Sequence, residues 1–130
     1  MTYAFDPELT PAVGVLPGTA LRDPARARAE VDRLLLEFGV SVDTTGLQVE
    51  DREVEGQDDQ PAVGVRVYRP VGEAPPHGRA AVLYIHGGGF VTGSIETEHG
   101  LATELASELD VVVVSVEYRL GARASGPRGD

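Results

Sequence analysis

The residues with the most distinctive chemistry are three consecutive glycines, Gly87, Gly88 and Gly89, which follow His86 and precede Phe90. Glycine weakens regular secondary structure, so a run of three is expected where the backbone bends sharply or approaches another group closely. The run follows a short apolar stretch, and open α/β sheets bind ligands at the carboxyl ends of such strands. Backbone N–H groups in this position can stabilise an anion that develops during a reaction. A merely permissive loop is the alternative interpretation.

A nucleotide phosphate is one anion that glycine-rich loops bind, but the required spacing is absent. Counted from Gly87 and Gly89, the third position of Gly-x-Gly-x-x-Gly falls on Thr92. No Gly-Lys-Ser or Gly-Lys-Thr follows the run either. Glu117 could contact a ribose at the end of a second apolar stretch. Without the glycine fingerprint, a nucleotide-binding domain is the weakest of the functions considered.

A nucleophile for covalent catalysis is not evident in the sequence. No serine stands in Gly-x-Ser-x-Gly, the strand-to-helix turn that exposes a catalytic hydroxyl. Ser94 fits a helix cap, and Ser115 lies inside an apolar stretch. His77 is placed in a linker and His99 on a helix. Because the three histidines are scattered and cysteine is absent, we predict no metal site and no cofactor.

The elements around the glycine run form a strand–helix–strand unit. Residues 80–85 and 111–116 are continuous apolar runs, which is typical of strands buried on both faces of a parallel sheet. Between them, from a start near residues 94–97, apolar residues recur at helical spacing: Leu101, Ala102, Leu105, Ala106 and Leu109. Crossovers of this kind are right-handed and join parallel strands, so the sheet belongs to the α/β class.

Two further elements precede this unit. Asp23 and Pro24 supply a helix start, Gly39 ends that helix, and its apolar positions are Val31, Leu34, Leu35 and Phe38. A period of two then predicts an antiparallel hairpin over residues 47–67, with a turn at 56–60. Its acidic residues do not match a calcium loop, so we expect a solvated edge and turn. Residues 1–20 carry three prolines and predict an extended arm.

Three motifs together resemble the hormone-sensitive-lipase-like branch of the α/β-hydrolases: His-Gly-Gly-Gly-Phe at 86–90, Val-Thr-Gly-Ser at 91–94, and Val-Val-Ser-Val-Glu-Tyr-Arg-Leu at 113–120. The resemblance covers about residues 23–120. It implies the N-terminal part of an α/β-hydrolase fold: an arm and cap helix, an antiparallel hairpin, then a βαβ unit of the parallel sheet. It also implies hydrolysis of small acyl-ester substrates.

The same resemblance implies roles for the loop residues. Gly88 and Gly89 donate their backbone N–H groups to the oxyanion, Gly87 lets the loop approach, and His86 braces the loop rather than acting as the base. In this fold the nucleophile, acid and histidine base follow later in the chain. The 130 residues are therefore expected to lack the Ser-Asp-His triad and to be inactive alone.

Residues 121–130 depart from the family pattern. After Leu120 the family usually continues Ala-Pro-Glu-His-Pro, whereas this chain reads Gly-Ala-Arg-Ala-Ser. One DNA sequence can encode Gly-Ala-Arg-Ala-Ser in one reading frame and Ala-Pro-Glu-His-Pro in a frame shifted by one base. Our hypothesis is therefore a one-base frameshift near Leu120. We therefore expect one partial domain over residues 1–120, followed by a disordered, off-pattern tail.

Composition limits the remaining choices. The chain has 130 residues, 42% hydrophobic and 25% charged, which fits one globular domain at most. A net charge of −10 repels nucleic acid and anionic lipid, so neither is expected as a partner. The sequence shows no membrane span and no signal peptide, so a cytoplasmic protein is expected. A noncatalytic module that binds an acyl or carboxylate ligand or a partner subunit stays open, as does the product of a decayed gene. Partly uncovered strands predict that the chain alone is poorly soluble or partly unfolded.

Overall fold

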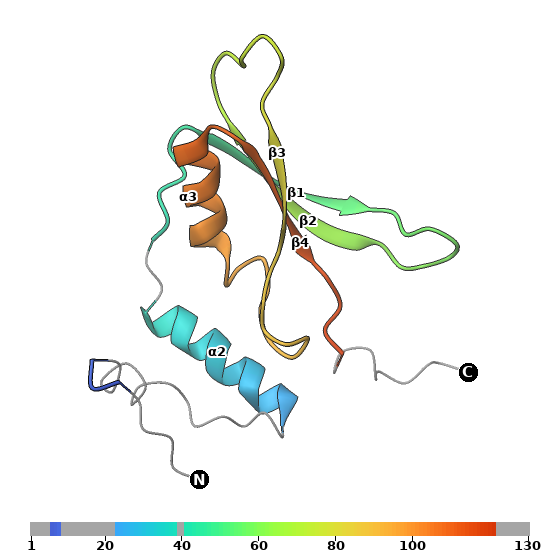
Figure 1. Ribbon diagram of the computed structural model, residues 1–130. Coiled ribbons are helices and arrows are strands. Elements are labelled where there is room, and N and C mark those ends of the chain that lie inside the picture. Colours follow the sequence, from blue (N-terminus) through green and yellow to red (C-terminus); the bar gives the residue numbers. More distant parts are fainter. Residues whose placement is uncertain (1–5, 9–22, 39–40, 122–130) are drawn as a thin grey trace.

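The computed structural model describes residues 6–8, 23–38 and 41–121. Its elements are, in chain order, α2 (Pro24–Phe38), β1 (Leu47–Val54), β2 (Val63–Pro70), β3 (Ala81–Ile85), α3 (His99–Leu109) and β4 (Val112–Glu117). The strands form one mixed sheet in the order β1-β2-β4-β3, and α3 lies against one face of it (Figure 1). This arrangement confirms the α/β class. The predicted arm, apart from residues 6–8, and the predicted tail, apart from residue 121, lie outside the described residues.

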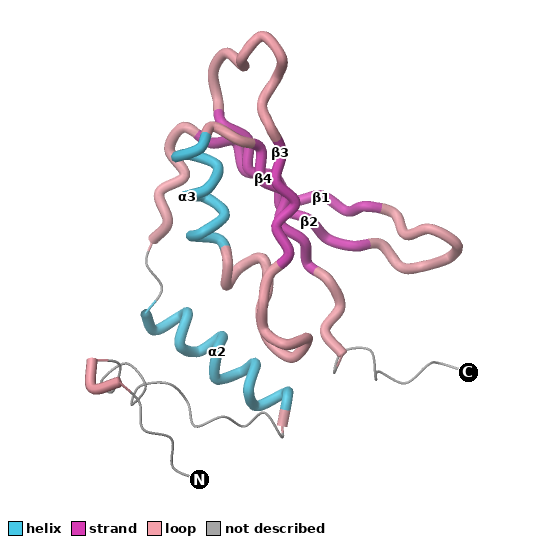
Figure 2. The backbone as a smooth tube through the Cα atoms, in the orientation of Figure 1, coloured by secondary structure: helices cyan, strands magenta, loops and turns pink. Residues whose placement is uncertain are grey.

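The predicted antiparallel hairpin is confirmed. β1 pairs with β2 from Leu47↔Pro70 to Val54↔Val63, and Figure 2 shows the two strands running together into the connecting loop that projects from the sheet. β1 is an edge strand, and its residues from position 50 onward are exposed, as expected for a solvated acidic edge. One cross-strand pair is charged: the Arg66 guanidinium donates two hydrogen bonds to Asp51, at 2.6 and 2.9 Å.

The predicted βαβ unit is also confirmed. β3 and β4 are parallel neighbours, paired from Ala81↔Val112 to Ile85↔Val116, and α3 connects them. The helix starts later than expected, at His99, because residues 94–98 form a separate turn. Parallel pairing brings the carboxyl ends of both strands to the same edge of the sheet, next to the glycine run.

The core lies between α3 and the sheet, and its fully buried apolar residues are Tyr68, Ala102, Ala106 and Val113. Of the apolar residues that predict this helix, Ala102 and Ala106 are buried, whereas Leu101 is 45% exposed and Leu109 is 60% exposed. Alanines at the contact let the helix approach the sheet closely, and the two leucines flank that contact.

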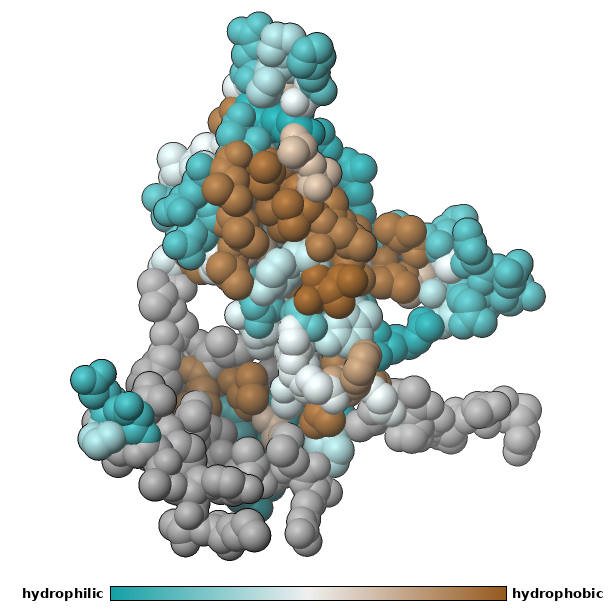
Figure 3. Space-filling model, in the orientation of Figure 1, coloured by the Kyte–Doolittle hydropathy of each residue, from teal (hydrophilic) through white to brown (hydrophobic). Residues whose placement is uncertain are grey.

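The second face of β3 is left open by the described residues. Side chains alternate along a strand, so Tyr84 faces α3 while Leu83 and Ile85 face the other way. Leu83 is 65% exposed and Ile85 63% exposed, which agrees with the expectation of partly uncovered strands and not with the two-sided burial that the apolar run alone predicts. The cause is its position, since β3 is the edge strand and α3 covers one face only. Figure 3 shows apolar side chains gathered over this part of the sheet.

The predicted first helix is confirmed as α2. Its start is capped by Asp23, whose carboxylate accepts the Arg26 N–H at 3.1 Å and whose carbonyl accepts the Ala27 N–H at 3.0 Å. The predicted end at Gly39 lies outside the described residues. Neither of the helices in the described ranges is long and apolar enough to cross a membrane.

Candidate functional site

The glycine loop, residues 86–93, begins where β3 ends and lies beside the end of β4. Its first side chain, His86, is only 3% exposed, whereas the three glycines that follow are exposed. The loop therefore combines a buried anchor with an open stretch of backbone. This is the position at which ligands meet open α/β sheets.

Two backbone donors of the glycine loop are free. Gly88 and Gly89 have φ angles of +112° and +62°, in the range that glycine adopts without strain. Their N–H groups donate to no atom in the described part of the chain. The Gly88 carbonyl accepts the N–H groups of Val91 and Thr92, at 3.0 and 3.1 Å, which closes the turn behind them. The result is two adjacent exposed donors on an ordered turn.

Close contacts explain two of the glycines in this segment. A Cβ atom on Gly88 would overlap the Thr92 carbonyl oxygen, and one on Gly93 would overlap His86 Nδ1. A Cβ on Gly87 or Gly89 would meet no atom within 4 Å. Gly88 and Gly93 are thus required by packing, while the space beside Gly87 and Gly89 is open.

The His86 ring is fixed from two sides. Its Nδ1 lies 2.8 Å from the Gly87 carbonyl oxygen, which can only accept, so Nδ1 carries the proton. The other ring nitrogen, Nε2, is buried and has no hydrogen-bond partner among the described residues. Because neither nitrogen faces the open side of the loop, this geometry suits an anchor rather than a proton-transfer group.

Tyr118, which the sequence analysis does not single out, completes the anchor. Its ring stacks on the His86 ring with centroids 4.2 Å apart and planes 17° apart. Its hydroxyl donates to the His86 carbonyl at 2.8 Å and lies 3.4 Å from the Gly87 carbonyl. The signal that could have revealed this residue is strand adjacency, because parallel β3 and β4 bring the residues after Ile85 and Glu117 together.

Arg28 is a second contact that the sequence analysis misses. It lies on α2 and donates from Nε to the Val91 carbonyl at 2.9 Å. This bond joins α2 to the glycine loop across 63 positions of sequence. Arg26, two residues earlier, pairs instead with Glu30 on the helix surface at 3.2 Å.

The glycine loop borders an open hollow of about 240 Å³, lined by Ile85, His86, Gly87, Gly89, Phe90 and Tyr118. Phe90 is 71% exposed, and its ring meets that of Tyr118 edge-on with centroids 6.0 Å apart. The hollow therefore places two aromatic rings beside backbone N–H groups. An apolar group carrying a small anionic or carbonyl centre fits this combination of surfaces.

The other serines and histidines of the described ranges do not form a catalytic pair. Ser94 exchanges hydrogen bonds with Thr97, as a cap of the turn before α3, and Ser115 is buried in β4. His99 Nδ1 lies 2.8 Å from the hydroxyl of Tyr68, whose pKa is raised by burial. His77 lies in the exposed link between β2 and β3. None of the described serines is hydrogen-bonded to a histidine.

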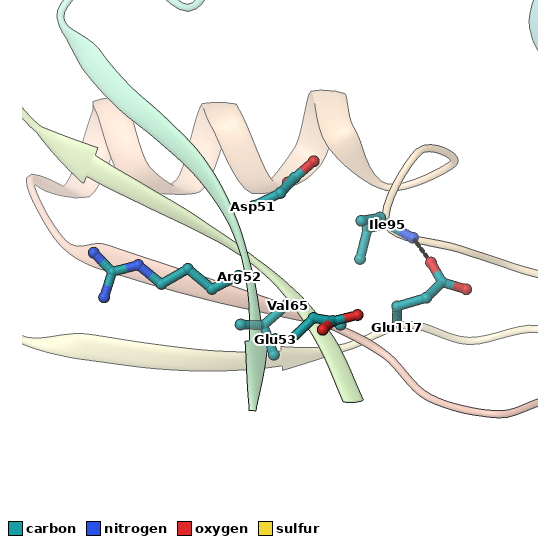
Figure 4. Close-up of a pocket in the computed structure, with 7 residues that line it drawn as sticks. Asp51, Arg52, Glu53, Val65, Ile95 and Glu117 are labelled. Carbon is teal, nitrogen blue, oxygen red and sulfur yellow. Dashed lines mark hydrogen bonds between the residues drawn. The ribbon is translucent and has the colours of Figure 1, made fainter. Parts of the chain in front are cut away.

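A second hollow, of about 300 Å³, lies against the hairpin and is lined by Asp51, Arg52, Glu53, Gly64, Val65, Ile95 and Glu117. Figure 4 shows its three carboxylates, with Arg52 pointing the opposite way. Asp51 is bonded to Arg66, which holds the pKa of that carboxyl below its usual value of 3.8. Glu117 accepts the Ile95 N–H at 2.9 Å. Within the described residues no group of three or more His, Cys, Asp or Glu side chains could hold a metal ion.

Comparisons with known proteins agree with the fold. A family model described as an α/β-hydrolase fold matches residues 82–128. Ethyl acetate hydrolase of Pseudomonas putida is 46% identical over 56 residues, which are 43% of this chain and 18% of that protein. Arylesterase of Saccharolobus solfataricus is 30% identical over 100 residues, which are 77% of this chain and 30% of that protein. The solved structure of a bacterial heroin esterase matches with a TM-score of 0.79 and 36% identity, covering 88% of this chain and 36% of that chain.

The chain belongs to the esterase and lipase family of the α/β-hydrolases. It holds only part of the family's fold, since it spans at most about a third of the length of these relatives. The family match includes the whole glycine loop and Tyr118. It also extends to residue 128, past the point where the sequence analysis expects an off-pattern tail, and that boundary stays a prediction.

Proposed function

We propose that this chain is the oxyanion-binding portion of a serine-type carboxylic ester hydrolase acting on small acyl esters. One observation carries the proposal: Gly88 and Gly89 present two free, adjacent N–H groups at the carboxyl end of β3. Donors of this kind stabilise the oxyanion of acyl transfer. In this proposal Gly88 and Gly89 bind the oxyanion, Gly87 leaves room for the acyl carbon, and His86 braces the loop.

The nucleophile, acid and base of this hydrolase are proposed to lie outside the 130 residues. Support comes from the sequence, which holds no Gly-x-Ser-x-Gly, and from Ser94 and Ser115, which serve a turn and a buried strand. We therefore expect the 130-residue chain alone to show no turnover of p-nitrophenyl butyrate. Turnover by the purified chain, abolished by a serine-directed phosphonate, would contradict this part of the proposal.

The decisive experiment tests the loop inside a complete catalytic framework. Residues 41–120 of this chain replace the matching segment of the bacterial heroin esterase, and hydrolysis of p-nitrophenyl acetate is measured. We expect activity, and we expect Gly88→Ala to lower kcat by about 10²- to 10³-fold, because its Cβ would displace the turn against Thr92.

Gly100→Ala is the matched control, since a Cβ there meets only Val42 Cγ2, at an ordinary 3.7 Å. It lies in the same βαβ unit and is expected to leave kcat unchanged. A folded chimera without activity, or a Gly88→Ala chimera as fast as its parent, would overturn the assignment of the loop.

The coding DNA offers an independent test of the same proposal. Sequencing through and beyond the Tyr118 codon is expected to show that a one-base change of frame restores Ala-Pro-Glu-His-Pro and opens a downstream Gly-x-Ser-x-Gly. If no such frame exists, the catalytic proposal fails for this gene.

A noncatalytic carboxylate-binding module is the second candidate. It is favoured by the same free N–H groups in a chain whose sequence lacks the nucleophile motif. Butyrate binding by the 130-residue chain, together with an inactive chimera and no downstream frame, would select this candidate over the first.

A further inference from the structure

The direction of each free N–H group is set by the carbonyl group of the preceding residue, because the two groups belong to the same peptide unit. A trans peptide is planar, and its C=O and N–H bonds point in opposite directions. Holding the Gly87 carbonyl therefore aims the Gly88 N–H, and holding the Gly88 carbonyl aims the Gly89 N–H. The contacts that aim the donors are those made by these carbonyl oxygens.

The Gly88 carbonyl is held by the loop itself. It accepts the N–H groups of Val91 and Thr92, and the Thr92 hydroxyl lies 3.4 Å away. These contacts are local, so the Gly89 donor is aimed wherever the turn forms. None of these three contacts to the Gly88 carbonyl involves Tyr118 or His86.

The Gly87 carbonyl is held differently. Its main donor is His86 Nδ1 at 2.8 Å, and its second contact is the Tyr118 hydroxyl at 3.4 Å. Tyr118 also fixes the imidazole by stacking on it and binds the His86 carbonyl at 2.8 Å. Within the described residues, both hydrogen bonds to the Gly87 carbonyl thus come from the His86–Tyr118 stack.

We propose that Tyr118 is a positioning residue that aims the Gly88 N–H at the bound anion by holding His86 and its carbonyl in place. The inference rests on the proposed function for the identity of the anion, but the positioning itself concerns the loop alone. Tyr118 acts through His86 and does not touch the anion. Its loss is expected to misdirect Gly88 while leaving Gly89 aimed.

Two substitutions separate the parts of this contact. Tyr118→Phe keeps the stack and removes the hydroxyl, and we expect it to weaken butyrate binding by about 2- to 12-fold, the range for one neutral hydrogen bond. Tyr118→Leu removes both the ring stack and the hydroxyl, and we expect it to weaken butyrate binding by about 5- to 150-fold. The matched control is Tyr84→Phe, which removes a hydroxyl bond of 2.7 Å to Glu98, away from the loop.

The measurement is NMR of the 130-residue chain labelled with ¹⁵N, at a concentration at which sedimentation velocity shows it to be monomeric, with sodium butyrate as the probe. Residual dipolar couplings of the Gly88 and Gly89 amides report the direction of each N–H bond without any ligand. We expect Tyr118→Leu to change the Gly88 coupling and spare that of Gly89, with β1 and β2 amides as the check on folding. Amide hydrogen exchange over residues 86–93, measured by mass spectrometry at low protein concentration, is expected to accelerate in Tyr118→Phe and Tyr118→Leu but not in Tyr84→Phe.

The outcomes distinguish this inference from the proposed function. An altered Gly88 coupling in Tyr118→Leu, together with a folded but inactive chimera, would support the positioning role and count against the proposed function. Butyrate binding that Tyr118→Leu leaves unchanged, with an unchanged Gly88 coupling, would overturn the positioning role. Loss of β1 and β2 signals in both variants at position 118 would show that Tyr118 supports the whole fold, and would likewise overturn a role specific to the loop.

Discussion

Replacing Leu83 and Ile85 together with lysine is expected to suppress self-association of this chain. Both side chains project from β3 on the face that α3 does not cover, with 65% and 63% of their surface exposed. Fully burying a Leu or Ile contributes about 1.5–3 kcal/mol, so burying the exposed two-thirds of each contributes about 1–2 kcal/mol. For the pair this amounts to about 2–4 kcal/mol, or about 30- to 1,000-fold in an association constant.

Sedimentation velocity over the micromolar range measures this effect directly. The unsubstituted chain is expected to sediment as a mixture of monomer and larger species, and the Leu83→Lys/Ile85→Lys chain as monomer. Lysine on an edge strand also discourages pairing of exposed strand edges. The substitution leaves Tyr84 and the α3 contact unchanged, so loss of the larger species would not require loss of the core.

The matched control is the pair Val54→Lys and Val71→Lys. These valines are 53% and 60% exposed and lie at or next to the ends of the hairpin strands β1 and β2 rather than on β3, so the two lysines add the same charge outside the β3 face. If the control pair suppresses association equally, net charge rather than the β3 face is responsible. A monomeric unsubstituted chain with a cooperative melt across the whole range would refute the reasoning.

Three further predictions concern the loop, the hairpin and α2. Gly93→Ala is expected to lower the free energy of unfolding, measured by urea denaturation, by about 2–4 kcal/mol, because φ is +95° and the Cβ would overlap His86. Gly87→Ala is the control and should change this free energy by less than about 0.5 kcal/mol, because its Cβ would meet no atom within 4 Å. Arg66 lowers the pKa of Asp51 below 3.8, so the stabilising contribution of the Asp51 carboxylate is present above that pH and is lost as the pH falls below it. Unfolding followed by circular dichroism should therefore show that Asp51→Asn loses less stability in this acid range than the parent chain. Arg28→Met should accelerate amide exchange in α2 and at the loop, while Arg26→Met, which breaks only a surface pair, should leave the loop unchanged.

The elements of the fold could be predicted because each depends on local pattern. Alternation predicts β1 and β2, and the apolar runs predict β3 and β4. The errors concern which faces are covered. A run such as residues 80–85 is apolar on both sides, and no local signal tells that α3 covers only the Tyr84 side. In the same way, leucine spacing in α3 does not reveal that Ala102 and Ala106 make the close contact.

The position of the glycine loop could be predicted because three glycines after an apolar strand have few structural explanations, whereas the chemistry implied by the resemblance of residues 86–94 and 113–120 to a hydrolase family stays a prediction. Arg28 and Tyr118 could not be predicted, because their roles come from contacts with Val91 and His86, far away in the chain. Helical period assigns Arg28 to a solvated surface. Only three-dimensional placement shows it bonded to the loop.

The position of Tyr118 follows from the topology of the sheet, and this explains why two distant motifs belong to one site. Because β3 and β4 are parallel neighbours with Ile85 beside Val116, the residues that follow them emerge at one edge. The first of these after β3 is His86, and the first after β4 is Tyr118, so their rings stack. The glycines provide N–H groups, but glycine backbone has little intrinsic preference for one direction. In our proposal a rigid anchor from the neighbouring strand, the His86–Tyr118 stack, supplies the direction that the glycine backbone itself lacks.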